Sequence, residues 1–454
     1  ELLTVGEPSN QYGQAVVEAG GRLIVGNASD QMVPNIILQD DGVNGTGVML
    51  FNPETTDLGN VQATIELRTN AHKISEGNYF WNYIGIPLKL DGEFTTANWE
   101  KLLPNRTAFD GFSYLQSWDF TEGWVNKGFE AFVPFKGVAI TNDSEEGVIY
   151  RFKGTMVGNA DENMEFKPRG YNFFANSYTA PIDIETLLNG LKNNGVVDAV
   201  VYMFDTENNR FADVSLGAFS GFHAPYFRVI PSMNGFFILN QQYQTSNQNL
   251  DYGDAVYNCA LGNRPIFAPK HEAMNFSRIH INVDADGMKD GLYLIENDEF
   301  TSEFENGYDV VKYMTEGQSN IYAQTTTGRQ SELFNSNIEG TMIGFEAAAN
   351  QTLYTLSFDE VQGDNFVLTD MVTGESVEMS EGNTYTFFAE AGQSNDNRFL
   401  VTRANKVPTT IGGLKNNAKV QGIYSVTGHY FGNVTEWNRL PQGVYMVNGV
   451  KVIK

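Results

Sequence analysis

The sequence predicts a mainly β protein, and two observations carry this prediction. Aromatic residues make up 13% of the 454 residues and 45 residues are glycine, whereas only 19% are charged. This balance favours short strands joined by turns over long amphipathic helices. The apolar runs are also of strand length and are separated by Gly, Asn and Asp. In chain order we expect an amino-terminal β-solenoid-like cap, a duplicated β-rich unit with short helices, an antiparallel β-sandwich and a short carboxy-terminal hairpin domain.

A chain of this length is too long for one hydrophobic core. Changes of pattern along the chain divide it into five segments. Residues 1–74 are expected to form the solenoid-like rungs or a cap, 75–165 the first β-rich repeat, 166–275 the second repeat, 276–404 the β-sandwich and 405–454 the carboxy-terminal domain.

The first segment predicts stacked parallel strands. In "AVVEAGGRLIVGNASDQMVPNIILQDDGVNGTGVMLFN", short apolar runs alternate with Gly, Asn and Asp turns. The runs are Ala15 to Val17, Leu23 to Val25, Ile36 to Leu38 and Val48 to Phe51. Such spacing suits the rungs of a parallel β-solenoid, in which each strand buries its face against the next rung. An ordinary pair of hairpins is the alternative.

The middle of the chain contains one unit twice. The stretch "YFWNYIGIPLKLDGEFTTANWEKLL" matches "GYNFFANSYTAPIDIETLLNGL", since each has an aromatic-Asn-aromatic strand, a turn and a short helix. Thr95 or Thr96 is expected to cap the first helix, and Asp183 is expected to cap the second, with Gly195 just past its end. This part of the chain is therefore predicted to be an internal duplication.

The match between the two copies continues into an aromatic hairpin. "FSYLQSWDFTEGW" resembles "AVVYMFDTENNRF", and both are typical of two strands joined by a turn that begins with Asp. The matched pairs are Tyr114 with Tyr202, Trp118 with Phe204, Asp119 with Asp205 and Trp124 with Phe211. Each copy then reaches a Gly-Phe strand, which we expect in "NKGFEAFVPF" and in "SMNGFFILN".

The segment from Phe276 to about Thr402 has the alternating pattern of antiparallel strands. Seven runs of this kind follow one another between turns: "RIHINVD", "GLYLIEN", "NIYAQTT", "TLYTLSFD", "NFVLTDM", "NTYTFFAE" and "RFLVTRA". Seven such strands predict a sandwich of two antiparallel sheets. A stretch of low hydrophobicity, "RANKVPTTIGGLKNNAKV", then leads to the carboxy-terminal segment.

Charge and length exclude several classes of partner. The chain has 29 basic and 55 acidic residues, and its formal charge of -26 disfavours nucleic acid as a partner. No apolar stretch reaches the eighteen or so residues that a membrane-spanning helix needs, so we expect the chain not to span a membrane. The single cysteine, Cys259, excludes an intrachain disulfide. The numbering begins at Glu1, so the lack of a signal peptide carries no conclusion about export.

The sequence offers no signature of catalysis. Its five histidines are dispersed, and HExxH, CxxC and GxSxG motifs are absent. Cys259, in "YNCALGN", lacks the local signature of a cysteine nucleophile and is better explained as a small buried residue. We therefore expect no enzyme activity and no cofactor, apart from one calcium candidate.

The calcium candidate is "DADGMKDG", in which Asp284, Asp286 and Asp290 lie close together on a turn. Closely spaced carboxylates can enclose a hard cation, but Met288 and Ile295 occupy ligand positions of the EF-hand spacing. A solvated hairpin turn is the alternative.

Three tryptophans beside turns are candidates for glycan binding. Trp118, Trp124 and Trp437 carry planar rings that could stack on the faces of sugars of a surface polysaccharide or a host glycan. Alternation within strands favours the other interpretation, in which these rings belong to the core.

The chain ends in "GIYSVTGHYFGNVTEWNRLPQGVYMVNGVKVIK". The motifs "IYSVTG", "LPQGVYMV" and "NGVKVIK" occur in this order up to the last residue, and the segment resembles the carboxy-terminal sorting domain of proteins exported by the type IX (Por) secretion system. The signal residues that this resemblance implies are Gly428, Leu440, Pro441, Gly443, Tyr445, Asn448, Gly449 and Lys454. Asn448-Gly449 favours a tight hairpin turn. A compact immunoglobulin-like or hairpin domain of this kind could be bound by strand addition.

The resemblance also defines the function that we expect. It implies recognition by the type IX translocon and export through the periplasm to the outer-membrane surface or the medium. Together with the missing catalytic motifs, it predicts a non-catalytic structural or adhesin-type protein of the cell surface. The alternative is a set of glycan-binding modules from a larger secreted protein.

Overall fold

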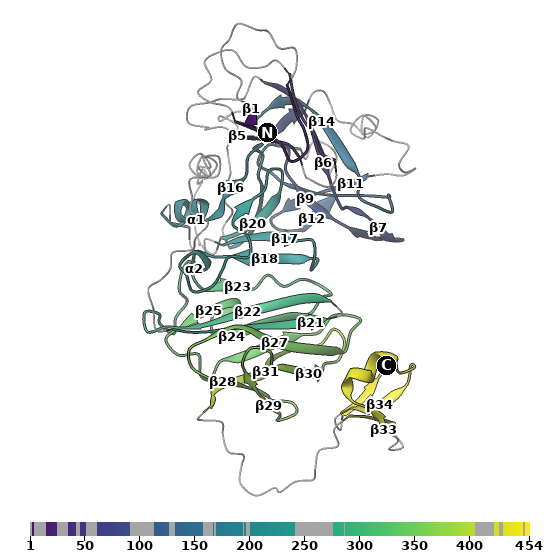
Figure 1. Ribbon diagram of the computed structural model, residues 1–454, viewed down its shortest axis with the longest axis vertical. Helices are drawn as coiled ribbons and strands as arrows, with labels where there is room; N and C mark the ends of the chain where they lie inside the picture. Colours follow the sequence, from purple (N-terminus) through teal and green to yellow (C-terminus); the bar gives the residue numbers. More distant parts are fainter. Residues whose placement is uncertain are drawn as a thin grey trace, which may run out of the picture. The chain divides into compact units, whose positions relative to one another are not determined.

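The computed structural model describes a series of segments that form two compact units (Figure 1). The described residues are 2–3, 15–24, 35–41, 46–50, 61–90, 113–126, 132–157, 167, 169–193, 195–196, 200–240, 276–285, 287–404, 422–425, 430–447 and 450–454. Unit 1 comprises Glu1–Arg278, Leu292–Glu316 and Thr325–Asn337. Unit 2 comprises Ile279–Gly291, Gly317–Gln324 and Ile338–Lys454. The predicted β class is correct, because strands form nearly all of the regular structure in both units.

Unit 1 begins with short parallel strands that alternate between two sheets. One sheet contains β1 (Leu2–Leu3), β3 (Arg22–Ile24) and β5 (Val48–Leu50), and the other contains β2 (Ala15–Val17), β4 (Asn35–Leu38) and β6 (Gln62–Arg68). All of these pairings are parallel, as when Asn35 faces Gln62 and Arg22 faces Val48. This pattern confirms the solenoid-like rungs, and the hairpin alternative is wrong.

The last strand of the parallel rungs, β6, has an antiparallel strand on its other edge. β14 (Ile149–Met156) pairs antiparallel with β6, and β10 (Leu88–Leu90) pairs with the other edge of β14. Ile65 on β6 and Phe152 on β14 face each other and are fully buried. A short hairpin of β7 (His72–Ser75) and β8 (Asn78–Phe80) follows β6.

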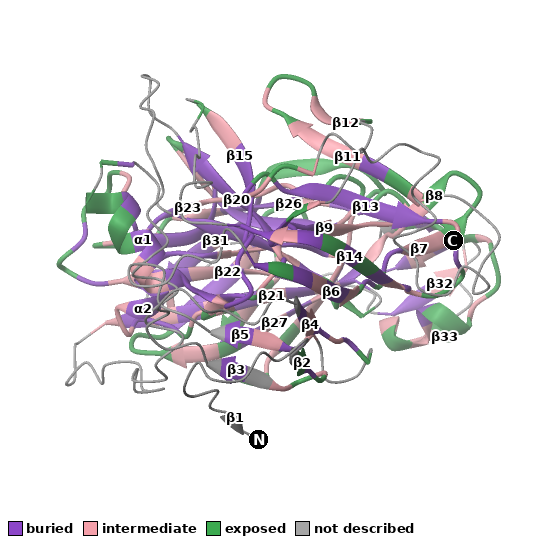
Figure 2. Cartoon of the chain, turned by 90° about the horizontal axis from the view of Figure 1, so that it is seen from above, coloured by how far each residue is buried: buried purple, intermediate pink, exposed green. Residues whose placement is uncertain are grey.

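The two copies of the duplicated unit form sheets with the same strand order. The first sheet has the order β12 (Gly123–Asn126), β11 (Ser113–Asp119), β13 (Val138–Asn142), β9 (Asn82–Ile84). The second has the order β18 (Arg210–Val214), β17 (Val201–Asp205), β20 (Gly235–Asn240), β15 (Gly170–Ala175). In both, the fourth strand along the chain lies between the first and the second. Figure 2 shows the two equivalent strands β13 and β20 buried along their length.

Strand register confirms the aromatic hairpins that the sequence predicts. Trp118 faces Trp124 in the first copy, and Phe204 faces Phe211 in the second. The aspartate at the start of each turn accepts hydrogen bonds from the turn backbone, as Asp119 does from the amide of Thr121 at 2.8 Å. Such side-chain caps explain why Asp occupies this position in both copies.

The predicted match of the Gly-Phe strands was out of register. The strand equivalent to β20 is β13, which begins at Val138, after the stretch "NKGFEAFVPF". "VPFKGVAITN" is therefore the counterpart of "IPSMNGFFILN". The backbone confirms this alignment. Phe135 and Met233, each two residues before the glycine of its strand, both have positive φ, at 61° and 64°.

Reciprocal hydrogen bonds join the two copies. The amide of Gly85 donates to the carbonyl of Met233 at 2.9 Å, and the amide of Ala175, the counterpart of Gly85, donates to the carbonyl of Phe135 at 3.0 Å. A contact in which each partner uses the same positions is the signature of two-fold symmetry. We therefore describe the duplicated unit as two halves related by an approximate two-fold axis that passes between Gly85 and Ala175.

Gly85 lies so close to this axis that a side chain does not fit. A Cβ atom added to Gly85 would lie 2.3 Å from the Cβ of Ala175. We expect Gly85→Val to lower the free energy of unfolding by about 1–3 kcal/mol, because the two halves must separate. Urea denaturation measures this change.

Gly190 provides the matched control for Gly85. It lies on the exposed side of a helix, and an added Cβ would meet nothing within 4 Å. Gly190→Ala should raise the free energy of unfolding by up to about 1 kcal/mol, because alanine restricts the unfolded chain. Equal midpoints for Gly85→Val and the wild type would contradict the tight packing at the axis.

The helix of the second copy is present as predicted. α1 spans Ile184–Asn193, and the side chain of Asp183 caps it by accepting from the amide of Thr186 at 2.8 Å. Gly195 follows with a φ of 79°. The helix predicted for the first copy, with Thr95 or Thr96 as its cap, lies outside the described residues. The remaining short elements of the second copy are α2 (Leu216–Phe219), β16 (Ile182–Asp183) and β19 (Val229–Ile230).

Unit 1 also contains part of the segment predicted to be the sandwich. β22 (Met288–Glu296) pairs with β25 (Gly328–Asn335), and β25 pairs with β23 (Val310–Val311). Tyr293 faces Glu332 in a parallel register. The expectation of a purely antiparallel segment is therefore wrong at this pair.

The strands of unit 2 are mostly antiparallel. They are β21 (Ser277–Ala285), β24 (Asn320–Thr325), β26 (Met342–Glu346), β27 (Leu353–Gln362), β28 (Phe366–Asp370), β29 (Ser376–Met379), β30 (Thr384–Phe388) and β31 (Ser394–Arg403). β26 and β28 flank β31, and β27 pairs with β30. β21 alternates strictly between buried and half-buried side chains, as a strand with one face on a core should. All seven predicted strands of the segment are present.

Candidate functional site

The carboxy-terminal residues form a sheet of their own. Its order is β33 (Tyr430–Gly432), β32 (Ile423–Ser425), β34 (Val444–Val447), β35 (Val450–Ile453), and a 3₁₀ helix (Val434–Arg439) lies between β33 and β34. Val447 faces Val450 across β34 and β35, so only two residues connect these strands. This short connection agrees with the predicted hairpin. Three signal residues, Gly428, Asn448 and Gly449, lie outside the described residues.

Lys454 ties the end of the chain to this sheet. Its backbone exchanges two hydrogen bonds with Gly443, at 2.8 and 3.0 Å. Its ammonium group donates to the carbonyl of Leu440 at 2.7 Å and to that of Trp437, and lies 5.6 Å from the Trp437 ring. These carbonyls are at the end of the 3₁₀ helix, and that of Trp437 also accepts from the amide of Leu440 at 3.1 Å. The terminal lysine therefore acts as a cap for the helix.

The inner face of the terminal sheet is a small aromatic core. Ile423, Trp437, Tyr445, Val447 and Val452 are buried together. The Tyr445 hydroxyl donates to the carbonyl of Pro441 at 2.8 Å. The predicted signal residues Leu440, Pro441, Gly443, Tyr445 and Lys454 thus belong to one connected structure at one end of the sheet.

The outer face of the sheet carries exposed apolar side chains next to Lys451, which faces Met446. Val444 faces Ile453 across β34 and β35, and Met446 lies on the same face two residues further along. Val444 is 38% exposed and Ile453 is 70% exposed. We call Val444, Met446 and Ile453 the outer strip. Apolar side chains left in water on a small sheet are typical of a surface that binds another protein.

The three candidate tryptophans for glycan binding are packing residues. Trp437 is only 4% exposed and lies in the core of the terminal sheet. Trp118 and Trp124 are half-buried between the two halves of the duplicated unit, where the ring of Trp124 lies 4.9 Å from Phe173. The indole of Trp118 donates to the carbonyl of Tyr171 at 2.9 Å. Because these rings pack against other parts of the protein, their positions do not support stacking on a sugar. The glycan hypothesis remains a prediction.

The two calcium candidates that the structure describes, Asp284 and Asp290, each bind a backbone amide. Asp284 accepts a hydrogen bond from the amide of Gly287 at 3.0 Å, as in an ordinary turn. Asp290 is buried and accepts from the amide of Ile321 at 2.7 Å. Asp286 lies outside the described residues. In the part of the chain that the structure describes, no group of three or more His, Cys, Asp or Glu residues could hold a metal ion.

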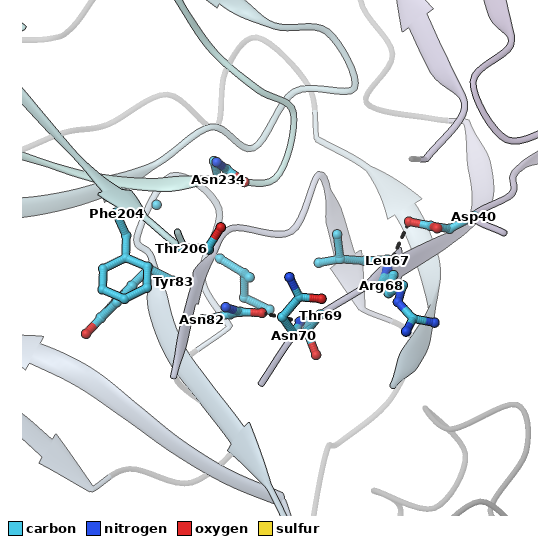
Figure 3. A pocket seen from close by; sticks show the side chains of 12 residues that line it. Asp40, Leu67, Arg68, Thr69, Asn70, Asn82, Tyr83, Phe204, Thr206 and Asn234 are labelled. Carbon is cyan, nitrogen blue, oxygen red and sulfur yellow. Dashed lines mark hydrogen bonds between the residues drawn. The ribbon is translucent and has the colours of Figure 1, made fainter. Parts of the chain in front are cut away.

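Unit 1 contains a pocket of about 310 Å³ at the junction of the two halves and β6. Figure 3 shows the rings of Tyr83 and Phe204 at one end of the pocket and Asp40 with Arg68 at the other. Asn70, Thr206 and Asn234 are further lining residues. No local motif predicts this pocket, because its walls come from segments that are far apart in the chain.

A buried acidic residue of unit 1 is expected to make stability depend on pH. Asp309 is 1% exposed and accepts hydrogen bonds from the amides of Phe334 and Glu305 at 2.7 and 2.8 Å. Burial nevertheless raises the pKa of Asp309 from 3.8 to about 7. Because the folded state holds this proton more tightly than the unfolded state, its stabilising effect is complete below pH 3.8 and is lost as the pH rises through 7.

We expect the contribution of Asp309 to the free energy of unfolding to be about 2 kcal/mol larger at pH 5 than at pH 8. Asp309→Asn removes the titrating group and should remove this difference. Urea denaturation of both proteins at the two pH values measures it. The same pH dependence in the variant and the wild type would contradict the assignment.

Comparison with known proteins finds a similarity to a fimbrium subunit. No family model and no solved structure matches the chain. The chain is similar to the minor fimbrium subunit Mfa5 of Porphyromonas gingivalis. The two are 24% identical over 433 residues, which cover 85% of this chain and 34% of Mfa5. The chain thus spans about a third of the length of Mfa5. Among the residues that the structure describes, no helix is both long and apolar enough to cross a bilayer.

Proposed function

We propose that the protein is a non-catalytic structural or adhesin-type component of a bacterial cell surface. The similarity to Mfa5, a fimbrium subunit, over most of this chain supports this proposal.

We further propose that the terminal sheet is the signal by which the type IX translocon recognises the protein. Residues 422–454 form a sheet of their own, whose aromatic core also contacts Leu353 and Phe388 of the neighbouring strands, and the Lys454 side chain binds to this sheet. The outer strip offers a partner an exposed apolar surface next to the edge strand β35. A folded tag of this kind can be bound by strand addition and by apolar contact.

A reporter fusion tests the export route. Residues 405–454 are fused to the carboxy terminus of a fluorescent protein and expressed in a bacterium that has this secretion system. We expect fluorescence on the outer surface or in the medium, and none there in a strain that lacks the translocon. Retention of the intact fusion in the periplasm would reject the signal.

A further inference from the structure

The pocket at the junction of the two halves of unit 1 combines apolar and polar walls. The rings of Tyr83 and Phe204, 4.9 Å apart, form its apolar end. The polar groups come from Arg68 on β6, from Asn70 just after it and from the turns that carry Thr206 and Asn234 (Figure 3). A concave site with aromatic rings and a few convergent polar groups is the usual form of a small-molecule site.

The polar groups of the pocket are available to a ligand. In the described part of the chain, no hydrogen bond or ion pair engages the side chains of Arg68, Asn70, Thr206 or Asn234. Asparagine and threonine side chains both donate and accept hydrogen bonds, whereas arginine only donates. The pocket therefore presents donors and acceptors together beside an aromatic end.

This combination does not suit an anion. A carboxylate or phosphate needs donors only, but here it would meet the carboxylate of Asp40, which already accepts from the amide of Arg68 at 2.9 Å. The formal charge of -26 on the whole chain would also repel it. A neutral ligand rich in hydroxyl groups can use donors and acceptors at once, and its C–H face can lie against an aromatic ring.

We propose that this pocket binds a neutral sugar residue, a single pyranose ring with unsubstituted hydroxyl groups. Arg68 and Asp40 bind hydroxyls at one end, and Asn70, Thr206 and Asn234 bind hydroxyls along the walls. Phe204 and Tyr83 provide the apolar end. A volume of about 310 Å³ is at the small end of ligand pockets, which suits a single ring. This proposal goes beyond the proposed surface role and does not depend on the export route.

Saturation-transfer NMR with the full chain tests the proposal. The probes are the methyl pyranosides of glucose, galactose, mannose and N-acetylglucosamine, with glucuronic acid as the charged comparison. At least one neutral pyranoside should bind, and it should bind more tightly than glucuronic acid. Arg68→Met and Asn234→Ala should each weaken this binding about tenfold, which is the loss of roughly one good hydrogen bond.

Two threonines provide a matched pair of variants. Thr206→Ala alters a residue of the pocket, whereas Thr121→Ala alters an exposed threonine in the equivalent turn of the first copy. Only Thr206→Ala should weaken binding, and urea denaturation should show both variants folded. Absence of binding by every neutral probe, preference for glucuronic acid, or equal binding by the wild type and the pocket variants would each overturn the proposal.

Discussion

Asp370→Ala is expected to lower the free energy of unfolding of the protein by about 3–5 kcal/mol, because it leaves a buried arginine without its counterion. Asp370 is 1% exposed and accepts from the guanidinium of Arg398 and the hydroxyl of Tyr385, at 2.8 and 2.9 Å. Arg398 is itself buried, with its guanidinium 5.0 Å from the ring of Phe387. Urea denaturation followed by tryptophan fluorescence measures the change.

An exposed ion pair of unit 2 provides the control for Asp370. Asp364 pairs with Arg403, and its side chain is 65% exposed. Asp364→Ala should change the free energy of unfolding by less than about 1 kcal/mol, because water solvates both charges. If Asp370→Ala were as mild as Asp364→Ala, the buried pair would not hold this part of the fold together.

The second large effect is expected on export rather than on folding. Val444→Asp combined with Ile453→Asp places two charges on the outer strip of the terminal sheet. Both side chains point into water, so the free energy of unfolding should change by no more than about 0.5 kcal/mol per site. We expect the exported fraction of the reporter fusion to fall at least about tenfold, as when a central apolar contact of an interface is lost.

A second double variant distinguishes the effect of the added charge from the effect of losing the apolar contact at the outer strip. Thr435→Asp with Asn438→Asp adds the same two charges at exposed positions of the 3₁₀ helix, outside the outer strip. Export of this variant should match the wild type. Equal export by the two double variants would exclude the outer strip as the recognition surface, whereas equal loss would show that net charge alone decides.

Strand positions could be predicted from the sequence where one face is buried. The alternation in "RIHINVD" reports the pleat directly, and β21 has the expected pattern of burial. The partners of a strand are harder to predict. The parallel pairing of β22 with β25 was missed, because side-chain alternation is the same in parallel and antiparallel strands. β25, "GRQSELFN", was also missed as a strand because its buried residues include Gln330, Ser331 and Glu332.

The candidate sites were predictable only where they are local in sequence. The connection between β34 and β35 follows from two adjacent residues and could be predicted. The outer strip could not be predicted, because "VYMV" is apolar on both faces and its sequence does not say which face of the strand is buried. The pocket depends on Arg68, Thr206 and Asn234, which only the fold brings together. The burial of Trp118 and Trp124 could not be predicted from their own strands, because it depends on contacts with the other half of the duplicated unit.

The reciprocal bonds of Gly85 and Ala175 carry a consequence for the ancestry of this protein. Each half of the duplicated unit buries much of its aromatic face against the other, although Tyr313 also packs against this cluster. A single half would leave this face uncovered without a second copy, and we infer that gene duplication and fusion joined two such copies in one polypeptide. Equivalent positions of the two halves could then diverge, and the first half now carries tryptophans where the second half carries phenylalanines.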